Sequence, residues 1–258
     1  MIQRRTEHGG RLRPGRWIGA ALLILVGVLP VGALAYRVQP LIVQLAPSGA
    51  GSATKLVLSN TEATPITLEL TPLAVTVGED GVAVRVPEDE DILVFPPQTI
   101  IPPGREQVVQ LRYVGAPDIA EAAVYAVRIS QLPVTVPGTQ PGGEGVGTDL
   151  KVGVDFISHV IVQGPDMVPD LRLGAAIRAA DGSLRVPVRN EGDGVVLGAD
   201  LVWTLTDEAG ATVEVGSDAA EVEGFGALLA DGALRTAVIA PGAAAGLSGD
   251  VSVTVRRP

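Results

Sequence analysis

The chain has 258 residues, two histidines, no cysteine and a net charge of −10 at neutral pH. Without cysteine, a disulfide framework and a thiol nucleophile are both excluded. The acidic balance repels phosphates, so nucleic acid and anionic lipid are disfavoured as partners.

The first 35 residues have the order of a secretory signal peptide. A basic segment precedes an almost purely apolar run over residues 17–34, and Ala33 and Ala35 flank a cleavage point before Tyr36. The rival interpretation is an uncleaved membrane anchor, since the run approaches the length that spans a bilayer. Pro30 and Gly32 near its end favour cleavage. We therefore expect residues 1–35 to be a signal peptide. The basic segment comprises Arg4, Arg5, Arg11, Arg13 and Arg16.

Short alternating runs between turn residues follow the leader, and no long stretch has a helical period with caps. Seven to eight such strands are the signature of an antiparallel sandwich. We predict a first sandwich domain over residues 36–164. The expected strands lie at residues 38–45, 55–59, 66–70, 82–86, 92–95, 107–113, 124–132 and 150–162.

A second set of strands begins after a short hinge at Gln163-Gly164-Pro165. It repeats the architecture of the first set but not its sequence. The fold class is therefore all-β, with two immunoglobulin-like β-sandwich domains after the signal peptide, the second over residues 165–258. Trp203 is expected in the second core. The expected strands lie at residues 175–179, 184–189, 199–206, 212–215, 233–240 and 251–256.

The residues needed for catalysis are scarce. His8 belongs to the leader, so His159 is the one histidine left, and it lies inside a predicted strand. No histidine pair remains for zinc, and neither a G-x-S-x-G elbow nor a phosphate-binding glycine motif is present. The acidic run Glu88-Asp89-Glu90-Asp91 lacks the ligand spacing of a calcium loop and is expected to be solvated. We predict no catalytic residue, metal site, cofactor or small-molecule substrate.

The strand expected over residues 150–162 is the best candidate for binding. Side chains alternate along a strand, so its aliphatic and aromatic residues share one face. A strand packed on its own core would show the same alternation, and so would a strand lent to a partner. The apolar face carries Leu150, Val152, Val154 and Phe156, and the opposite face carries Lys151, Gly153, Asp155 and His159.

Three ordered motifs resemble the PapD-like periplasmic pilus chaperones. They are DILVFPP at residues 91–97, IPPGREQVVQLR at residues 101–112 and YAVRISQLP at residues 125–133. Leu56-Val57-Leu58-Ser59-Asn60 and Pro65 resemble the second strand and following turn of that family. The resemblance covers roughly residues 36–165, and the second half of the chain is compatible with it.

The resemblance implies donor-strand complementation, in which the last strand of the first domain fills a groove in an incomplete pilin. The inserted side chains would be Leu150, Val152, Val154 and Phe156. The implied partners are pilin or fimbrial subunits and an outer-membrane usher in the periplasm, with no nucleotide, metal or nucleic acid involved. The alternative from another class is a structural immunoglobulin-like adhesion or envelope module without a client, which would cover the long strand.

The anchor positions of the family are altered in this chain. The family holds the carboxylate at the pilin's C-terminus with an arginine on the first strand and a lysine on the last. The arginine position falls within residues 42–44, which include no basic residue; Arg37 is the nearest basic residue on that strand. The lysine position falls at His159. Glu121 matches an acidic residue that helps to hold the two domains together, but its arginine partner is replaced by Gln163. We therefore expect hydrophobic insertion to matter more than carboxylate anchoring.

Overall fold

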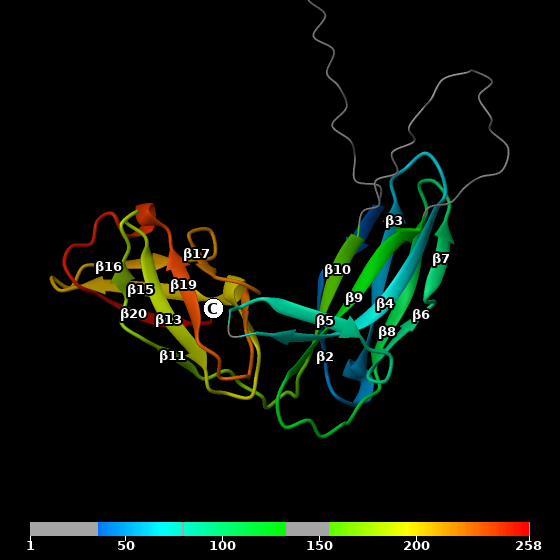
Figure 1. Ribbon diagram of the computed structural model, residues 1–258, viewed down its shortest axis with the longest axis horizontal. Coiled ribbons are helices and arrows are strands. Elements are labelled where there is room, and N and C mark those ends of the chain that lie inside the picture. Colours follow the sequence, from blue (N-terminus) through cyan, green and yellow to red (C-terminus); the bar gives the residue numbers. More distant parts are fainter. Residues whose placement is uncertain (1–35, 79, 133–154, 258) are drawn as a thin grey trace, which may run out of the picture. The chain divides into compact units, whose positions relative to one another are not determined.

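The structure, a computed structural model, describes residues 36–78, 80–132 and 155–257 (Figure 1). The all-β prediction is confirmed, because the described helical residues form three short 3-10 turns, Gly49–Ser52, Gly198–Asp200 and Pro241–Ala244. Over the described ranges, no helix is long and apolar enough to cross a membrane.

The first sandwich consists of two sheets around one core. The four-stranded sheet has the order β1 (Tyr36–Gln39), β3 (Ala53–Asn60), β8 (Glu106–Tyr113) and β6 (Ile92–Phe95). The second sheet has the order β2 (Ile42–Leu45), β10 (Asp155–Val162), β9 (Ala123–Leu132), β4 (Ile66–Val77) and β5 (Ala83–Pro87), and β7 (Gln98–Ile101) also pairs with β4. Alternate residues of both sheets face inward and are buried, as the period of two predicts.

The first predicted strand, residues 38–45, is in fact two strands in different sheets. β1 pairs with β3, whereas β2 pairs in parallel with β10. The break falls at Pro40, which follows a cis peptide bond and has no N–H to offer to a ladder. One short segment therefore contributes an edge to each sheet.

Other boundaries differ from the sequence prediction in identifiable ways. β4 extends to Val77 rather than ending at residue 70, and it crosses Pro72 within the sheet. β7 was not predicted, because its four residues follow directly after Pro96-Pro97. The described part of the last strand begins at Asp155, so residues 150–154 lie outside the described residues.

The second sandwich has shorter strands. One sheet has the order β11 (Leu171–Leu173), β13 (Leu184–Asn190), β19 (Arg235–Ile239) and β17 (Ala220–Val222), and β12 (Ile177–Arg178) also pairs with β13. Another has the order β16 (Thr212–Val215), β15 (Val202–Asp207) and β20 (Val251–Arg256), and β14 (Val196–Leu197) pairs with β18 (Ala227–Leu228). Trp203 is 1% exposed in this core, which confirms its predicted place.

A third apolar cluster joins residues of the two strand sets. It combines residues from β4, β9 and β10 with Val195 and Ala227. Two hydrogen bonds accompany it: the Val195 amide donates to the Gln163 side-chain oxygen (3.1 Å), and the Ala122 amide donates to the Asp193 carbonyl (2.8 Å). The described residues all fall within one compact unit. The predicted boundary at residue 164 lies between the end of β10 and the start of β11.

Candidate functional site

β10 has two halves with different surroundings. His159–Val162 is paired on both sides, with β9 along one edge and β2 along the other. Asp155–Ser158 pairs with β9, and no other described strand pairs with it. We call the unpaired backbone side of Asp155–Ser158 the free edge.

The direction of the backbone groups at the free edge follows from the neighbouring hydrogen bonds. The His159 amide donates to the Leu41 carbonyl (2.8 Å), and the Gln163 amide donates to the Leu45 carbonyl (3.0 Å). Alternate residues of a strand direct their N–H and C=O groups to the same side. The polar backbone groups of Asp155 and Ile157 therefore point to the free edge, which is a template for an added strand.

One side-chain face of β10 belongs to the first core. Ser158, Val160 and Val162 are buried, and the half-buried Phe156 packs edge-on against Tyr36, with ring centroids 4.8 Å apart. Phe156 therefore contributes to the core of its own sandwich. The other proposed donor side chains, Leu150, Val152 and Val154, lie outside the described residues.

Tyr36 links the two sheets beside the free edge. Its side chain is fully buried, and its hydroxyl donates to the Ile129 carbonyl of β9 (2.7 Å). Burial raises the pKa of the Tyr36 phenol, and the nearby Asp155 carboxylate raises it further. The phenol is therefore neutral at ordinary pH and can donate this hydrogen bond.

His159 lies on the opposite face of β10, in contact with side chains from two other segments. Its Nε2 atom is 3.4 Å from an Nη2 atom of Arg85, and its ring stacks edge-on against Phe225 at 5.1 Å. Guanidinium only donates, so Nε2 accepts and Nδ1 carries the proton. Burial lowers the pKa of His159, and the charge of Arg85 lowers it further. The imidazole is therefore neutral at neutral pH.

The contact between Arg85 and His159 spans the face of the sheet. Along one row, Ile42 lies opposite His159, His159 opposite Ala126, and Ala126 opposite Leu73. Arg85 lies on the edge strand β5, opposite Val75. The contact therefore joins the edge strand β5 to β10, although β4 and β9 lie between them in the sheet. Sequence reasoning missed Arg85, since only the sheet order brings it near a residue 74 positions away.

The other predicted anchor is in a different place. Arg37 is exposed on β1, in the sheet that does not contain β10, and lies opposite Ser59. The structure therefore does not bring Arg37 and His159 into one strand pair. The first-strand residue opposite His159 is Ile42, whose side chain is 46% exposed.

Glu121, the predicted interdomain residue, is exposed at the rim of a shallow cavity. This cavity, of about 340 Å³, is also lined by Val77 and by Asp231 of the second sandwich. Gln163, at the position of the usual arginine, instead accepts the hydrogen bond from the Val195 amide. Glu121 therefore lies between residues of both sandwiches, and its role in holding them remains a prediction.

A small apolar cavity lies beside His159. It measures about 120 Å³ and has residues of both sandwiches in its wall. Ile42, His159 and Ile161 contribute from β2 and β10, and Phe225 and Ala227 contribute from the second sandwich. The Arg85 side chain, held at His159, places a positive charge near this cavity.

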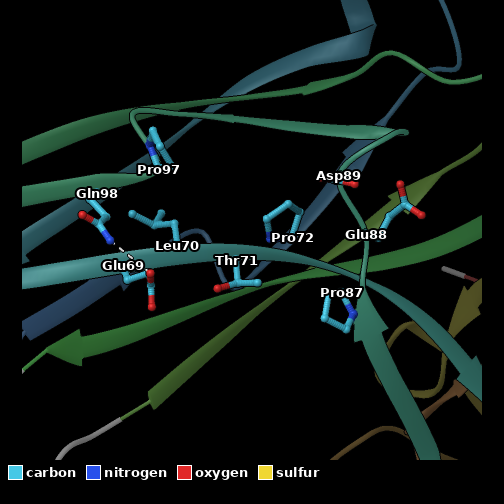
Figure 2. Close-up of a pocket in the computed structure, with 9 residues that line it drawn as sticks. All are labelled: Glu69, Leu70, Thr71, Pro72, Pro87, Glu88, Asp89, Pro97 and Gln98. Atoms are coloured by element: carbon cyan, nitrogen blue, oxygen red, sulfur yellow. Dashed lines mark hydrogen bonds between the residues drawn. The ribbon is translucent and has the colours of Figure 1, made fainter.

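A larger groove lies along β4, between β5 and β7 (Figure 2). Its volume is about 480 Å³, and Glu69, Glu88 and Asp89 make it acidic. Glu88 Oε1 accepts hydrogen bonds from the amides of Glu90 and Asp91, at 2.6 and 2.8 Å. The acidic run is therefore held in place by hydrogen bonds within its own loop. Among the described residues, no cluster of three or more potential ligands could hold a metal.

Comparisons with known proteins give matches in structure rather than in sequence. No protein-family profile and no curated protein matches the sequence. The structure of the class 5 fimbriae chaperone CfaA is similar with a TM-score of 0.50 and 11% identity, over 86% of this chain and 99% of that one. The Escherichia coli chaperone DraB is similar with a TM-score of 0.50 and 13% identity, over 84% and 86% of the two chains. The resemblance inferred from the sequence motifs is thus confirmed as a likeness of fold: the chain has the two-sandwich architecture of these chaperones.

Proposed function

We propose that the protein is a periplasmic chaperone that binds unfinished pilus or fimbrial subunits by strand addition at β10. The observation that carries the proposal is the free edge at Asp155–Ser158, which lies before the start of β2, so that the backbone groups of Asp155 and Ile157 have no strand beside them in the described residues. An exposed edge is an aggregation hazard unless something pairs with it. A chaperone that lends a strand uses this hazard as its binding site.

The segment before the free edge supports the same function. In sequence, Leu150, Val152 and Val154 continue the face of β10 that carries Phe156. Burial of each aliphatic side chain in a client groove contributes about 1.5–3 kcal/mol. The alternation would also fix the register of the backbone hydrogen bonds. Since Phe156 packs on Tyr36, we assign insertion to the three aliphatic residues.

The start of β2 limits how far a client strand could extend along β10. β2 occupies the edge from His159 onward, so an added strand must stop beside Leu41 and Ile42. A client strand parallel to β10 would place its C-terminal carboxylate there. Arg85 and His159 would hold that carboxylate, with Arg85 in the role that the sequence prediction gave to Arg37.

The remaining parts of the proposal concern location and partners. The signal peptide over residues 1–35 would direct export and be cleaved before Tyr36, and the client would pass to an outer-membrane usher. The protein would act without catalysis or cofactor, because strand pairing and side-chain burial supply the binding energy. Sequencing the N-terminus of the periplasmic protein tests the cleavage site, since an uncleaved anchor would retain residues 1–35.

The test of the proposal is co-purification of a subunit from the periplasm. The double variant Leu150→Asp, Val152→Asp should lose the client, because each carboxylate would have to be buried in the client groove. The control Lys151→Asp, Gly153→Asp places two carboxylates on the opposite face, where it also removes one positive charge, and should retain more of the client. Mass spectrometry of co-purifying proteins identifies the subunit. Equal client recovery from the two double variants would contradict the proposal.

The alternative is a structural module with no client. Such a protein would co-purify with no subunit in any form, and its free edge would be protected from hydrogen exchange when it is purified alone. An unprotected Ile157 amide together with a bound subunit would exclude this alternative.

A further inference from the structure

The strand β20 of the second sandwich has an unpaired backbone side. β20 pairs with β15 along one side, and no other described strand pairs with it. Within the described ranges, β11 and β12 pair only with β13. β11 and β20 approach each other at one flank of the sandwich, where a groove of about 670 Å³ is lined by residues 173–176, 206–208 and 250–253. We call the unpaired backbone side of β20 the open edge.

The backbone groups at the open edge follow from a hydrogen bond of the neighbouring strand. The Asp207 amide donates to the Ala211 carbonyl (3.0 Å), on the side of β15 that faces β16. Because backbone direction alternates along a strand, the next residues of β15 bond instead to Ser252 and Thr254 of β20. The N–H and C=O groups of the alternate residues of β20 therefore point to the open edge. These residues are Val251, Val253 and Val255.

The sequence of β20 favours pairing with another chain. Edge strands are commonly protected by a proline or a charged residue, and Val251–Val255 contains neither. Val253 and Val255 are half-buried on the face that packs against the core, whereas Ser252 and Thr254 are exposed on the other face. A strand added at the open edge would cover more of the two valine side chains.

The open edge is complementary to itself. Two copies of β20 can pair antiparallel about a two-fold axis at Val253, which places Val253 opposite Val253 of the partner and Val251 opposite Val255 of the partner. All three valines point their backbone groups to the axis, so each opposed pair exchanges two hydrogen bonds, about six in all. In this register the core-facing side chains of both copies lie on the same face of the joined sheet.

The same register also brings unlike charges together. Arg256 lies opposite Asp250 of the partner at each end of the strand pair, and both side chains are exposed on the same face. Within its own copy, Arg256 contacts Glu214 at 3.2 Å, and its guanidinium has further donors for a second carboxylate. The net charge of −10 makes two copies repel over most of their surfaces, so these ion pairs favour contact at this edge.

We infer that two copies of the protein pair through antiparallel β20 strands and form a closed, two-fold homodimer. The strand pair is about 20 Å long, which gives a smaller contact than a stable interface usually has, so the dimer should form reversibly at micromolar concentration. The inference does not depend on the proposed function, because β20 belongs to the second sandwich and the free edge of β10 is unused in both copies.

The first test is sedimentation velocity of the purified periplasmic protein over a range of concentrations. Val253→Pro should abolish the dimer, because it removes an N–H group that points to the open edge. The same change removes no hydrogen bond to β15, so the sandwich should stay folded. Val253→Thr is the matched control, since it keeps the N–H group and the branched shape, and should retain the dimer. Urea unfolding checks that both variants are folded.

A second test exchanges the charges at the ends of the strand pair. Asp250→Arg and Arg256→Asp each place like charges opposite one another at both ends, and each should weaken the dimer roughly tenfold. An equimolar mixture of the two variants should dimerise again, because unlike charges then lie opposite one another at both ends. Asp218→Arg, at an exposed turn before β17, changes the net charge as Asp250→Arg does and should not weaken the dimer.

The outcomes decide the inference by themselves. A protein that stays monomeric at every concentration, or that grows into larger oligomers, would overturn it. A dimer that survives Val253→Pro, or a mixture of the charge variants that stays monomeric, would also overturn it, because the contact would then lie elsewhere. None of these variants changes β10, so each of these results would leave client binding by strand addition intact.

Discussion

The two halves of β10 belong to one continuous strand but have different surroundings. From His159 to Val162 the strand is bonded on both edges, and Val160, Ile161 and Val162 are buried. From Asp155 to Ser158 it pairs with β9, no second described strand accompanies it, and Phe156 and Ile157 are only half-buried. Hydrophobic alternation therefore does not distinguish a strand that stabilises its own sandwich from one that could be lent. The distinction depends on where the neighbouring strand β2 begins.

The largest expected effect comes from placing a charge in the doubly paired half. Val160 is fully buried, so Val160→Asp should destabilise the protein by more than about 4 kcal/mol and sharply reduce the soluble yield. The matched change Ile157→Asp should cost less, because that side chain is half-buried. Urea unfolding and periplasmic yield measure both. Equal losses would mean that the two halves are equally part of the core.

Phe156 tests whether a half-buried residue of β10 stabilises its own sandwich or is inserted into a client. Phe156→Ala should cost about 2–3 kcal/mol, less than a fully buried ring, because it removes the contact with Tyr36. Phe156→Leu should cost about half as much, since it retains apolar volume. Urea unfolding of the client-free protein is the measurement. Unchanged stability combined with loss of the client would instead place Phe156 among the inserted side chains.

The period-two patterns predicted much of the fold. The runs that became β3 and β8 alternate between apolar and polar residues, and those that became β6 and β9 are largely apolar runs bounded by turn residues. The ranges of all four were recovered to within about two residues. The first strand was predicted in one piece, because apolar alternation continues through Pro40 and does not reveal the change of sheet. The two-residue strands β12, β14 and β18 depend on tertiary packing and have no local period.

The site was only partly predictable for a related reason. His159 could be picked out because it falls at a motif position on a single strand. Its contacts with Arg85 and Phe225 depend on sheet order and on packing of distant loops, which one sequence does not reveal. Arg37 was chosen as the nearest cation in sequence, yet the break at Pro40 carries it into the other sheet.

A smaller effect is expected from the hydroxyl that joins the sheets beside the free edge. Tyr36→Phe keeps the ring against Phe156 but removes the bond to the Ile129 carbonyl, at a cost of about 1 kcal/mol. Tyr113→Phe is a suitable comparison, because the longer bond of Tyr113 to the Ala116 carbonyl (3.1 Å) is away from β10. Urea unfolding measures both. Client loss from Tyr36→Phe without loss of stability would indicate that the hydroxyl acts in binding instead.

The smallest expected effect is the pH response of His159. Burial and the charge of Arg85 lower its pKa in the folded protein below the ordinary 6.5. As the pH falls from about 6.5 towards that lowered pKa, the unfolded chain takes up a proton more readily than the folded one, so stability decreases over this window and is unaffected above it.

In the chain without residues 1–35, His159 is the only histidine, so NMR titration follows one imidazole. Arg85→Met should move its pKa back towards 6.5, since it removes the neighbouring charge, whereas Arg37→Met should leave it unchanged because Arg37 lies in the other sheet. A titration at or above 6.5, or equal shifts from the two variants, would contradict the arrangement of Arg85 over His159. Arg37, on the other sheet, would then have the same influence on His159 as Arg85.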